Sequence, residues 1–196
     1  MEDLSESIEF KNVKTSNKKK QIILSETKRN YKNYINSLKY RYNGKNPYLP
    51  NYVVTKNGEI FKIIKDNQHT KFIGIDEIDN KSINIVLENY GWLKKNPIDN
   101  TYVNFIGDIY KGEVYEKKWR DQLFWDTYQE KQIESLSKLI VEICDKLNIK
   151  KECIGTNVRN DESLNFEGIV SKSNFDYIYK DINPSFNFKL LNEKIK

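Results

Sequence analysis

One apolar stripe in the last third of the chain constrains the fold more than any other feature of the sequence. Apolar side chains recur there at intervals of three and four residues, the spacing of one helix face, at Ile133, Leu136, Leu139, Ile140, Ile143 and Leu147. The preceding Thr127-Tyr128-Gln129-Glu130 has the Thr-x-x-Glu pattern of a capping box, in which hydroxyl and carboxylate bind otherwise unpaired amides. The sequence therefore predicts a helix from Thr127 to about Leu147 that packs against a core.

Short apolar runs interleave with helical patterns along the rest of the chain. Asn57-Gly58 lies between two β-rich runs and is a strong hairpin signal. We expect strands at 21–24, 52–55, 59–64, 82–87 and 169–170, a helix at 27–42, an irregular β-rich insertion at 98–118 and a loop at 176–188. This order predicts an α/β fold with one central mixed β-sheet flanked by helices. We expect a single domain at 21–190, with a flexible charged tail at 1–20 and a C-terminal tail at 191–196.

Composition narrows the classes of function. No run approaches the ~18 apolar residues of a membrane span, and residues 1–20 lack an apolar signal core, so we expect no membrane association. Cys144 and Cys153 make no disulfide framework or metal pattern. The chain has no alanine and few arginines, which suggests an AT-rich genome and a virus or phage as its owner. The localisation is left open, with host cytoplasm or virion expected if the protein is viral.

The net charge of +5 is spread along the chain rather than gathered on one segment. Only residues 11–20 are densely basic, and a solvated tail is the favoured interpretation. Because lysines and tyrosines are both abundant, a basic nucleic-acid- or protein-binding module stays an alternative, although nucleic acid is not the expected partner.

A series of segments follows a recognisable order along the chain, at 21–27, 50–61, 67–70, 82–91, 128–149, 168–175 and 181–186. In this order they resemble the zinc-dependent N-acetylmuramoyl-L-alanine amidases of the type shared by phage lysins and peptidoglycan-recognition proteins. The resemblance implies the amidase and peptidoglycan-recognition fold. It also implies an enzyme that cleaves the bond between the glycan's lactyl group and L-alanine, using one zinc held by two histidines and an Asp or Cys. Such a site leaves one position open for an activated water.

The three metal-ligand positions of this family fall on Ser25 (or Leu24, which is no zinc ligand either), Lys172 and Asp181. Leu24-Ser25-Glu26-Thr27 stands where the family has an Ile-His-His-Thr-like motif, and Lys172 stands at its second histidine. Serine is not a normal zinc ligand and an ammonium opposes metal binding, so Asp181 is the one plausible ligand. We expect no bound cofactor, and we expect Lys172 to replace the charge of the metal by pairing with Asp181.

Three further residues are candidates for the substrate groove. His69 is the single histidine of the chain and matches a family position near the groove, although a lone histidine is more often structural. Asn51 and Asn183 lie in matched segments. No residue is assigned a catalytic role.

The resemblance and the altered ligand positions together favour a non-catalytic amidase homologue. Its expected partner is peptidoglycan or a muropeptide, or else a protein. An active lysin-like amidase with an unconventional site is the alternative.

Overall fold

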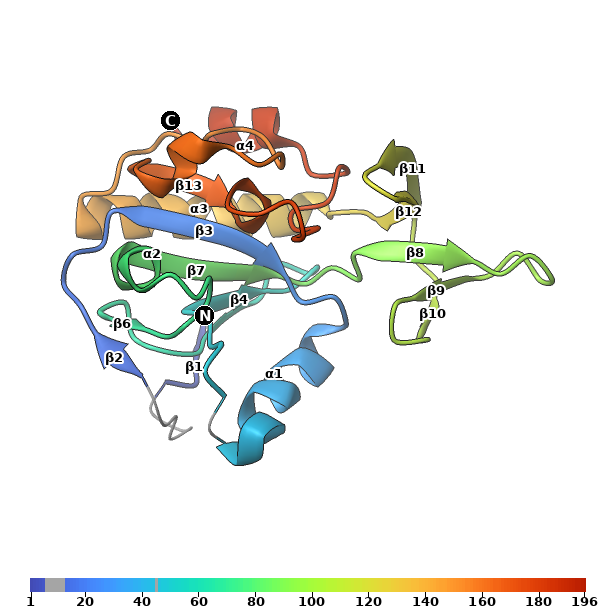
Figure 1. Ribbon diagram of the computed structural model, residues 1–196, viewed down its shortest axis with the longest axis horizontal. Helices are drawn as coiled ribbons and strands as arrows, with labels where there is room; N and C mark the ends of the chain where they lie inside the picture. Colours follow the sequence, from blue (N-terminus) through green and yellow to red (C-terminus); the bar gives the residue numbers. More distant parts are fainter. Residues whose placement is uncertain (6–12, 45) are drawn as a thin grey trace.

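A mixed sheet of six strands forms the centre of the computed structural model, which describes residues 1–5, 13–44 and 46–196 (Figure 1). The strand order is β1-β5-β4-β7-β3-β13. Only β4 and β5 pair antiparallel, and the other neighbours are parallel. The strands are β1 (Glu2–Asp3), β5 (Ile60–Lys62), β4 (Tyr52–Val54), β7 (Ser82–Leu87), β3 (Gln21–Glu26) and β13 (Gly168–Ser171). The predicted α/β fold with a central mixed sheet is confirmed.

Helices cover both faces of this sheet. The side chains of β3 alternate: Ile22 and Leu24 pack with α3 (Glu130–Leu147) and α4 (Phe188–Ile195), whereas Ile23 packs on the face of α2 (Asp76–Lys81). The α2 face also carries α1 (Tyr31–Tyr40), which packs on β4. Because the central strands are buried on both faces, they carry apolar runs, 22–24 in β3 and 85–87 in β7, as is typical of parallel sheets.

Helix α3 begins three residues later than the sequence predicts. Its N-cap is Gln129, which makes no side-chain cap bond, so the capping box at Thr127 is wrong. The cause is a tertiary contact. Thr127 lies in the connection from the second sheet to α3, and its carbonyl accepts a hydrogen bond from the Asn89 side chain. The stripe itself is confirmed: Ile133, Leu136, Leu139, Ile140 and Ile143 are all buried.

The hairpin between β4 and β5 is also confirmed. Thr55 and Glu59 bracket three loop residues, and the Thr55 carbonyl accepts from the Gly58 amide at 2.9 Å. Gly58 alone in this loop has positive φ, at +81°. A Cβ there would lie 2.5 Å from the Ser135 hydroxyl of α3, so glycine also lets the hairpin approach the helix.

Residues 92–126 form a regular second sheet rather than an irregular insertion. Five antiparallel strands have the order β10-β9-β8-β12-β11 and project from one end of the molecule (Figure 1). They are β8 (Trp92–Lys95), β9 (Tyr102–Asn104), β10 (Ile109–Tyr110), β11 (Val114–Trp119) and β12 (Gln122–Asp126). The fully buried Asp126 anchors this sheet, because its carboxylate binds the Lys56 ammonium at 2.5 Å and the Tyr90 amide at 2.7 Å.

The predicted N-terminal tail is structured where the chain is described. Strand β1 pairs with β5, and β2 (Lys14–Thr15) pairs with β6 (Gln68–His69). Lys19 is buried, and its ammonium donates to the Ser82 carbonyl at 2.8 Å. The paired backbone and this buried ammonium contradict a flexible tail. Residues 6–12, the rest of that prediction, lie outside the described residues.

The C-terminal end is likewise not a tail. Residues 188–195 form α4, and Leu191 and Ile195 are fully buried against α3. Their four-residue spacing puts both on one helix face. The helix expected at 27–42 begins only at Tyr31, capped by the Asn30 side chain. Short 3₁₀ turns complete the fold: η1 (Arg41–Gly44), η2 (Asp161–Leu164) and η3 (Lys172–Asn174).

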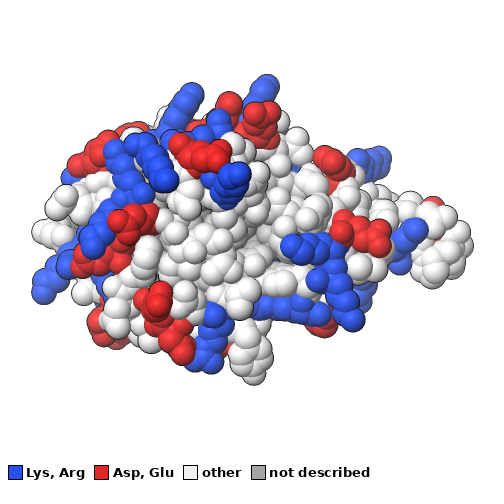
Figure 2. All heavy atoms as spheres, turned by 90° about the horizontal axis from the view of Figure 1, so that it is seen from above, with Lys and Arg blue, Asp and Glu red and all other residues white. Residues whose placement is uncertain are grey.

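Two surface properties bear on partners. Within the ranges that the structure describes, no helix combines the length and apolar character needed to cross a membrane. Figure 2 shows one face of the molecule, on which basic and acidic side chains alternate around a broad uncharged centre.

Candidate functional site

The three family ligand positions lie at or just beyond the carboxyl ends of β3 and β13. These strands are parallel neighbours, so Ser25 near the end of β3 and Lys172 directly after β13 meet at one edge of the sheet. Asp181 follows in the loop after η3, and its Oδ1 accepts from the Glu26 amide at 3.3 Å. The fold therefore brings together the region that the sequence predicts.

The cation that occupies this edge is Lys28. Its ammonium lies 2.6 Å from Glu26 Oε2, 2.9 Å from the Lys180 carbonyl and 3.0 Å from Asp181 Oδ1. An ammonium has three N–H donors, and all three find oxygen acceptors here. Lys28 therefore ties the end of β3 to the loop that carries Asp181.

Glu26 is the innermost member of this cluster. Its side chain is fully buried, its Oε2 binds Lys28, and its Oε1 accepts from the Asn183 amide at 2.5 Å and from the Tyr128 hydroxyl. Burial raises the pKa of Glu26, and the Lys28 ammonium opposes that rise. Burial by itself would lower the pKa of Lys28, but the Asp181 and Glu26 carboxylates outweigh it, so its pKa is raised. Lys28 therefore stays charged.

The expected pairing of Lys172 with Asp181 is wrong. The Lys172 ammonium lies over two aromatic rings, 4.5 Å from the centroid of Phe72 and 4.6 Å from that of Tyr179. Within the described residues it makes no ion pair, and burial lowers its pKa. Lys28 pairs with this carboxylate instead: it lies in the bend directly after β3, where its backbone has a positive φ of 59°.

The three residues predicted to line the substrate groove do not lie together. Lys19 contacts the carbonyls of Gln68 and Ser82, which places β6, and with it His69, near the amino ends of the parallel strands. Asn51 is fully buried, and its side chain bonds the backbone of Lys65, Gln68 and Asn84. His69 and Asn51 therefore do not join Asp181, and Asn51 acts in the core.

Asn183 does join the Lys28 cluster. Its backbone amide binds Glu26, and its buried side chain donates to Asn89 Oδ1 at 2.9 Å and to the Asp126 carbonyl at 3.1 Å. It is a positioning residue that holds the loop after Asp181 against the second sheet.

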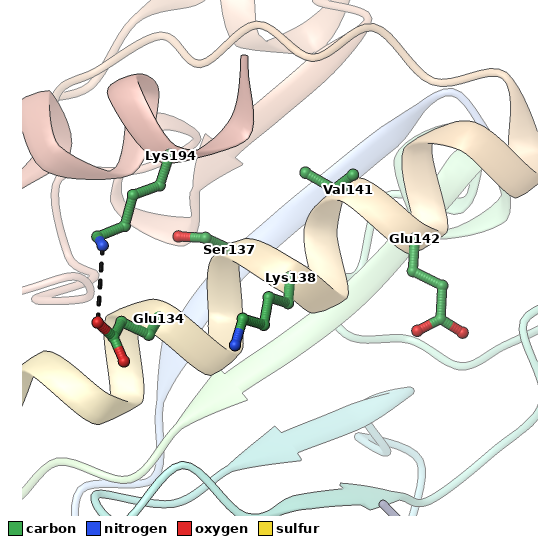
Figure 3. Close-up of a pocket in the computed structure, with 6 residues that line it drawn as sticks. All are labelled: Glu134, Ser137, Lys138, Val141, Glu142 and Lys194. Atoms are coloured by element: carbon green, nitrogen blue, oxygen red, sulfur yellow. Dashed lines mark ion pairs between the residues drawn. The ribbon is translucent and has the colours of Figure 1, made fainter.

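A groove of about 360 Å³ opens beside the cluster. Lys28 and Asp181 line it, together with residues of the second sheet and of the loop before Asp181, which are Trp92, Phe105, Ile178, Tyr179 and Lys180. A second groove, of about 460 Å³, lies between α3 and α4. The Lys194–Glu134 ion pair spans it at 3.8 Å, and Glu142 points elsewhere (Figure 3).

The donor set at the Lys28 cluster does not fit zinc. Zinc sites in proteins use nitrogen, thiolate and carboxylate donors around one point. Here Ser25 and Lys172 stand at two of the positions, and the Asp181 Oδ1 already binds an ammonium. Among the residues with a described placement, no group of three His, Cys, Asp or Glu side chains could hold a metal ion.

Lys28, Glu26 and Tyr128 are the members of the site that the sequence analysis does not identify. A signal existed for two of them: Glu26 and Lys28 are charges two residues apart at the end of a buried apolar strand. A carboxylate at the end of a buried strand needs a partner, because buried charges are rarely left unpaired, and the nearby lysine can supply one.

Comparisons with known proteins agree with this fold. A family model described as N-acetylmuramoyl-L-alanine amidase matches residues 15–166. No curated protein sequence matches. Among solved structures, the amidase AmiD from E. coli, in complex with an anhydro-N-acetylmuramic acid tripeptide, is similar with a TM-score of 0.59 and 17% identity.

Two further structures share the fold. The amidase LysC from Clostridium intestinale has a TM-score of 0.55 and 13% identity, and 96% of each chain is covered. AmpDh3 from Pseudomonas aeruginosa, in complex with an anhydromuramic pentapeptide, has a TM-score of 0.57 and 13% identity. The match covers 92% of this chain in both the AmiD and the AmpDh3 comparison, but only 58% of AmiD and 61% of AmpDh3.

Proposed function

This chain belongs to the N-acetylmuramoyl-L-alanine amidase family, and we propose that it binds peptidoglycan fragments without hydrolysing them. The family and the two neighbours that hold muramyl peptides support the choice of ligand. The loss of hydrolysis is argued from the side chains of this chain alone. A viral owner, suggested by the alanine-free composition, belongs to the same proposal.

The Lys28 cluster is the observation that carries this proposal. An ammonium surrounded by Glu26, Asp181 and the Lys180 carbonyl stands beside the positions where the resembled family binds its metal. The three acceptors use up its donors, so Lys28 has none left to polarise a substrate carbonyl. A catalytic site needs a donor aimed at the oxyanion of the transition state.

The cluster also offers no free general base for the hydrolysis. Hydrolysis needs a base within hydrogen-bond reach of the attacking water. Both oxygens of Glu26 are engaged, one by Lys28 and one by Tyr128 and Asn183, and the side chain is fully buried. The groove can therefore hold a ligand, but the neighbouring side chains of Lys28, Glu26 and Asp181 are already paired with one another.

Purified peptidoglycan sacculi provide the test. The protein is dialysed against a weak chelator, its zinc content is measured, and it is then mixed with sacculi in the presence and absence of added zinc. We expect cosedimentation, a zinc-to-protein ratio well below one, and no release of stem peptides, with an active lysin as the positive control.

Release of stem peptides would establish the alternative of an active amidase with an unconventional site. Stoichiometric zinc would overturn the argument that this donor set does not fit the metal. A failure to cosediment would remove peptidoglycan as the partner.

A further inference from the structure

The groove beside Lys28 has an aromatic wall and an apolar lip. Trp92 of β8 and Phe105 after β9 pack with ring centroids 6.3 Å apart. At the mouth, 45% of Phe105 and 61% of Ile178 is exposed. Large exposed apolar side chains that line a hollow mark a ligand site more often than isolated ones do.

The opposite wall is held in place. Arg120, in the turn between β11 and β12, donates to the carbonyls of Tyr177 and Tyr179. The neighbouring Asp121 binds the Lys180 ammonium at 2.6 Å. Because two side chains of the turn clamp the loop at both sides of Ile178, the groove is formed before any ligand arrives, which lowers the entropic cost of binding.

Cations flank the aromatic wall. The Lys94 ammonium lies 5.5 Å from the Trp92 ring centroid, and the Lys180 ammonium lies 6.0 Å from it. Lys180 is already paired with Asp121, whereas Lys94 makes no ion pair in the part of the chain that the structure describes. A ring platform with an unpaired ammonium beside it suits a ligand that combines an apolar ring face with a carboxylate.

We propose that this groove binds an acidic amino sugar, with its ring against Trp92 and Phe105 and its carboxylate on Lys94. In peptidoglycan this chemistry belongs to muramic acid whose lactyl carboxylate is free. The carboxylate is free only after an amide hydrolysis has removed the stem peptide, so the ligand is the glycan product of that class of reaction. The inference rests on the proposed function and narrows its ligand.

The strand geometry supplies a matched control. Lys94 and Lys95 are consecutive exposed residues of β8, and Lys94 lies opposite Val103 while Lys95 lies opposite Tyr102. Consecutive side chains of a strand point to opposite faces, so Lys94 shares the face of Trp92 and Lys95 does not. Lys94→Gln and Lys95→Gln therefore remove the same charge from two faces of one strand.

The first experiment titrates the protein with N-acetylmuramic acid and with N-acetylglucosamine, which lacks the lactyl carboxylate, and follows binding by ligand-observed NMR. We expect wild type to bind N-acetylmuramic acid about tenfold more tightly, in keeping with one charge-assisted contact. Lys94→Gln should remove that preference, Lys95→Gln should keep it, and Phe105→Ala should weaken both sugars. Equal binding of the two sugars by wild type, no binding of either, or equal effects of the two lysine variants would overturn the proposal.

The second experiment separates this inference from the proposed function. Sacculi are compared before and after treatment with an active amidase, which leaves free lactyl carboxylates on the glycan. We expect treatment to increase cosedimentation of wild type and of Lys95→Gln but not of Lys94→Gln. If untreated sacculi bind and treatment adds nothing, the acidic-sugar site is wrong and the proposed function stands. If only treated sacculi bind, the acidic-sugar site stands and binding of intact peptidoglycan does not.

Discussion

The Lys28 ammonium lies 3.0 Å from the Asp181 carboxylate, and this ion pair joins the end of β3 to the loop after β13. The Asp181 side chain is 9% exposed and that of Lys28 is 22% exposed, so water screens the pair weakly. Together with Glu26, the pair forms an internal cross-link at the edge of the sheet where the resembled family would bind its metal.

Removing Lys28 should destabilise the protein strongly. Lys28→Met leaves the Glu26 and Asp181 carboxylates together without a cation, and breaking a buried pair in this way typically costs about 3–5 kcal/mol. Chemical denaturation measures the loss. Adding Asp181→Asn should recover part of it, because one stranded charge is then removed.

Lys172→Met is the matched control for that experiment. It removes a cation that contacts two aromatic rings but makes no ion pair with any residue whose placement is described, so we expect a smaller loss, of about 2 kcal/mol or less. Equal losses for Lys28→Met and Lys172→Met would contradict the assignment of Lys28 as the cross-link.

Restoring histidines at the family positions should not be enough to create a tight zinc site. Ser25→His with Lys172→His supplies two nitrogen donors, but Lys28 still competes for Asp181. Adding Lys28→Ala should therefore raise the zinc affinity, as measured by competition with a colorimetric chelator. If the double variant already binds zinc as tightly as the triple variant, Lys28 does not guard the carboxylate.

The apolar face of α3 should be essential for stability. Leu139 is 3% exposed in the main core, and Leu139→Ala should cost about 2–5 kcal/mol through lost burial and the cavity left behind. The neighbouring Lys138→Ala, on the exposed side of the helix, is the control and should stay within about 0.5 kcal/mol of wild type. An unchanged denaturation midpoint for Leu139→Ala would mean that this face does not pack on the sheet.

Helix caps provide a test of the corrected boundaries. The side chains of Asn30 and Asn187 cap the starts of α1 and α4. Each accepts a hydrogen bond of 2.9 Å from the backbone amide three residues later. Asn30→Ala and Asn187→Ala should each cost about 1 kcal/mol in thermal or chemical denaturation. Thr127→Ala should cost less than either, because Gln129 and not Thr127 occupies the N-cap of α3. A larger loss of stability for Thr127→Ala than for the two asparagine variants would show that Thr127 does cap α3.

His69 should make the fold sensitive to mild acid. Burial lowers the pKa of His69, and the nearby Lys19 and Lys14 lower it further while Asp76 opposes them. The unfolded chain therefore binds a proton more readily than the folded one, so the free energy of unfolding falls as the pH drops from about 7 to 5. His69→Gln should flatten this dependence, which denaturation at a series of pH values measures. A steeper slope in the variant would reverse the sign of this argument.

The sequence alone determined the parts of the fold that follow from local periodicity. The stripe of α3, the runs of β3 and β7 and the hairpin at Gly58 are each specified by residues close together in the chain. Hydrophobic spacing decides which face a helix or strand buries, and that information is local. The same residues carried enough of the family pattern to indicate the amidase fold.

Boundaries and additional elements depended on distant contacts. Strand β1 exists through its pairing with β5, α4 through its packing on α3, and the start of α3 through the bond from Asn89 to Thr127. None of these partners is near in sequence, so propensity could not reveal them. The second sheet was missed as a regular element because its exposed strands carry charged residues where a buried sheet would be apolar.

Which lysine meets Asp181 was decided by tertiary structure alone. The sequence placed Lys172 and Asp181 in one region, and the fold confirmed that neighbourhood. Yet the ammonium that pairs with Asp181 comes from Lys28, which lies in the left-handed bend after β3 and contacts both Glu26 and Asp181. An ion pair acts over a few ångströms, and a position in the sequence does not fix a side chain to that precision. The fold class was therefore local information, whereas the chemistry of the site depended on three-dimensional packing.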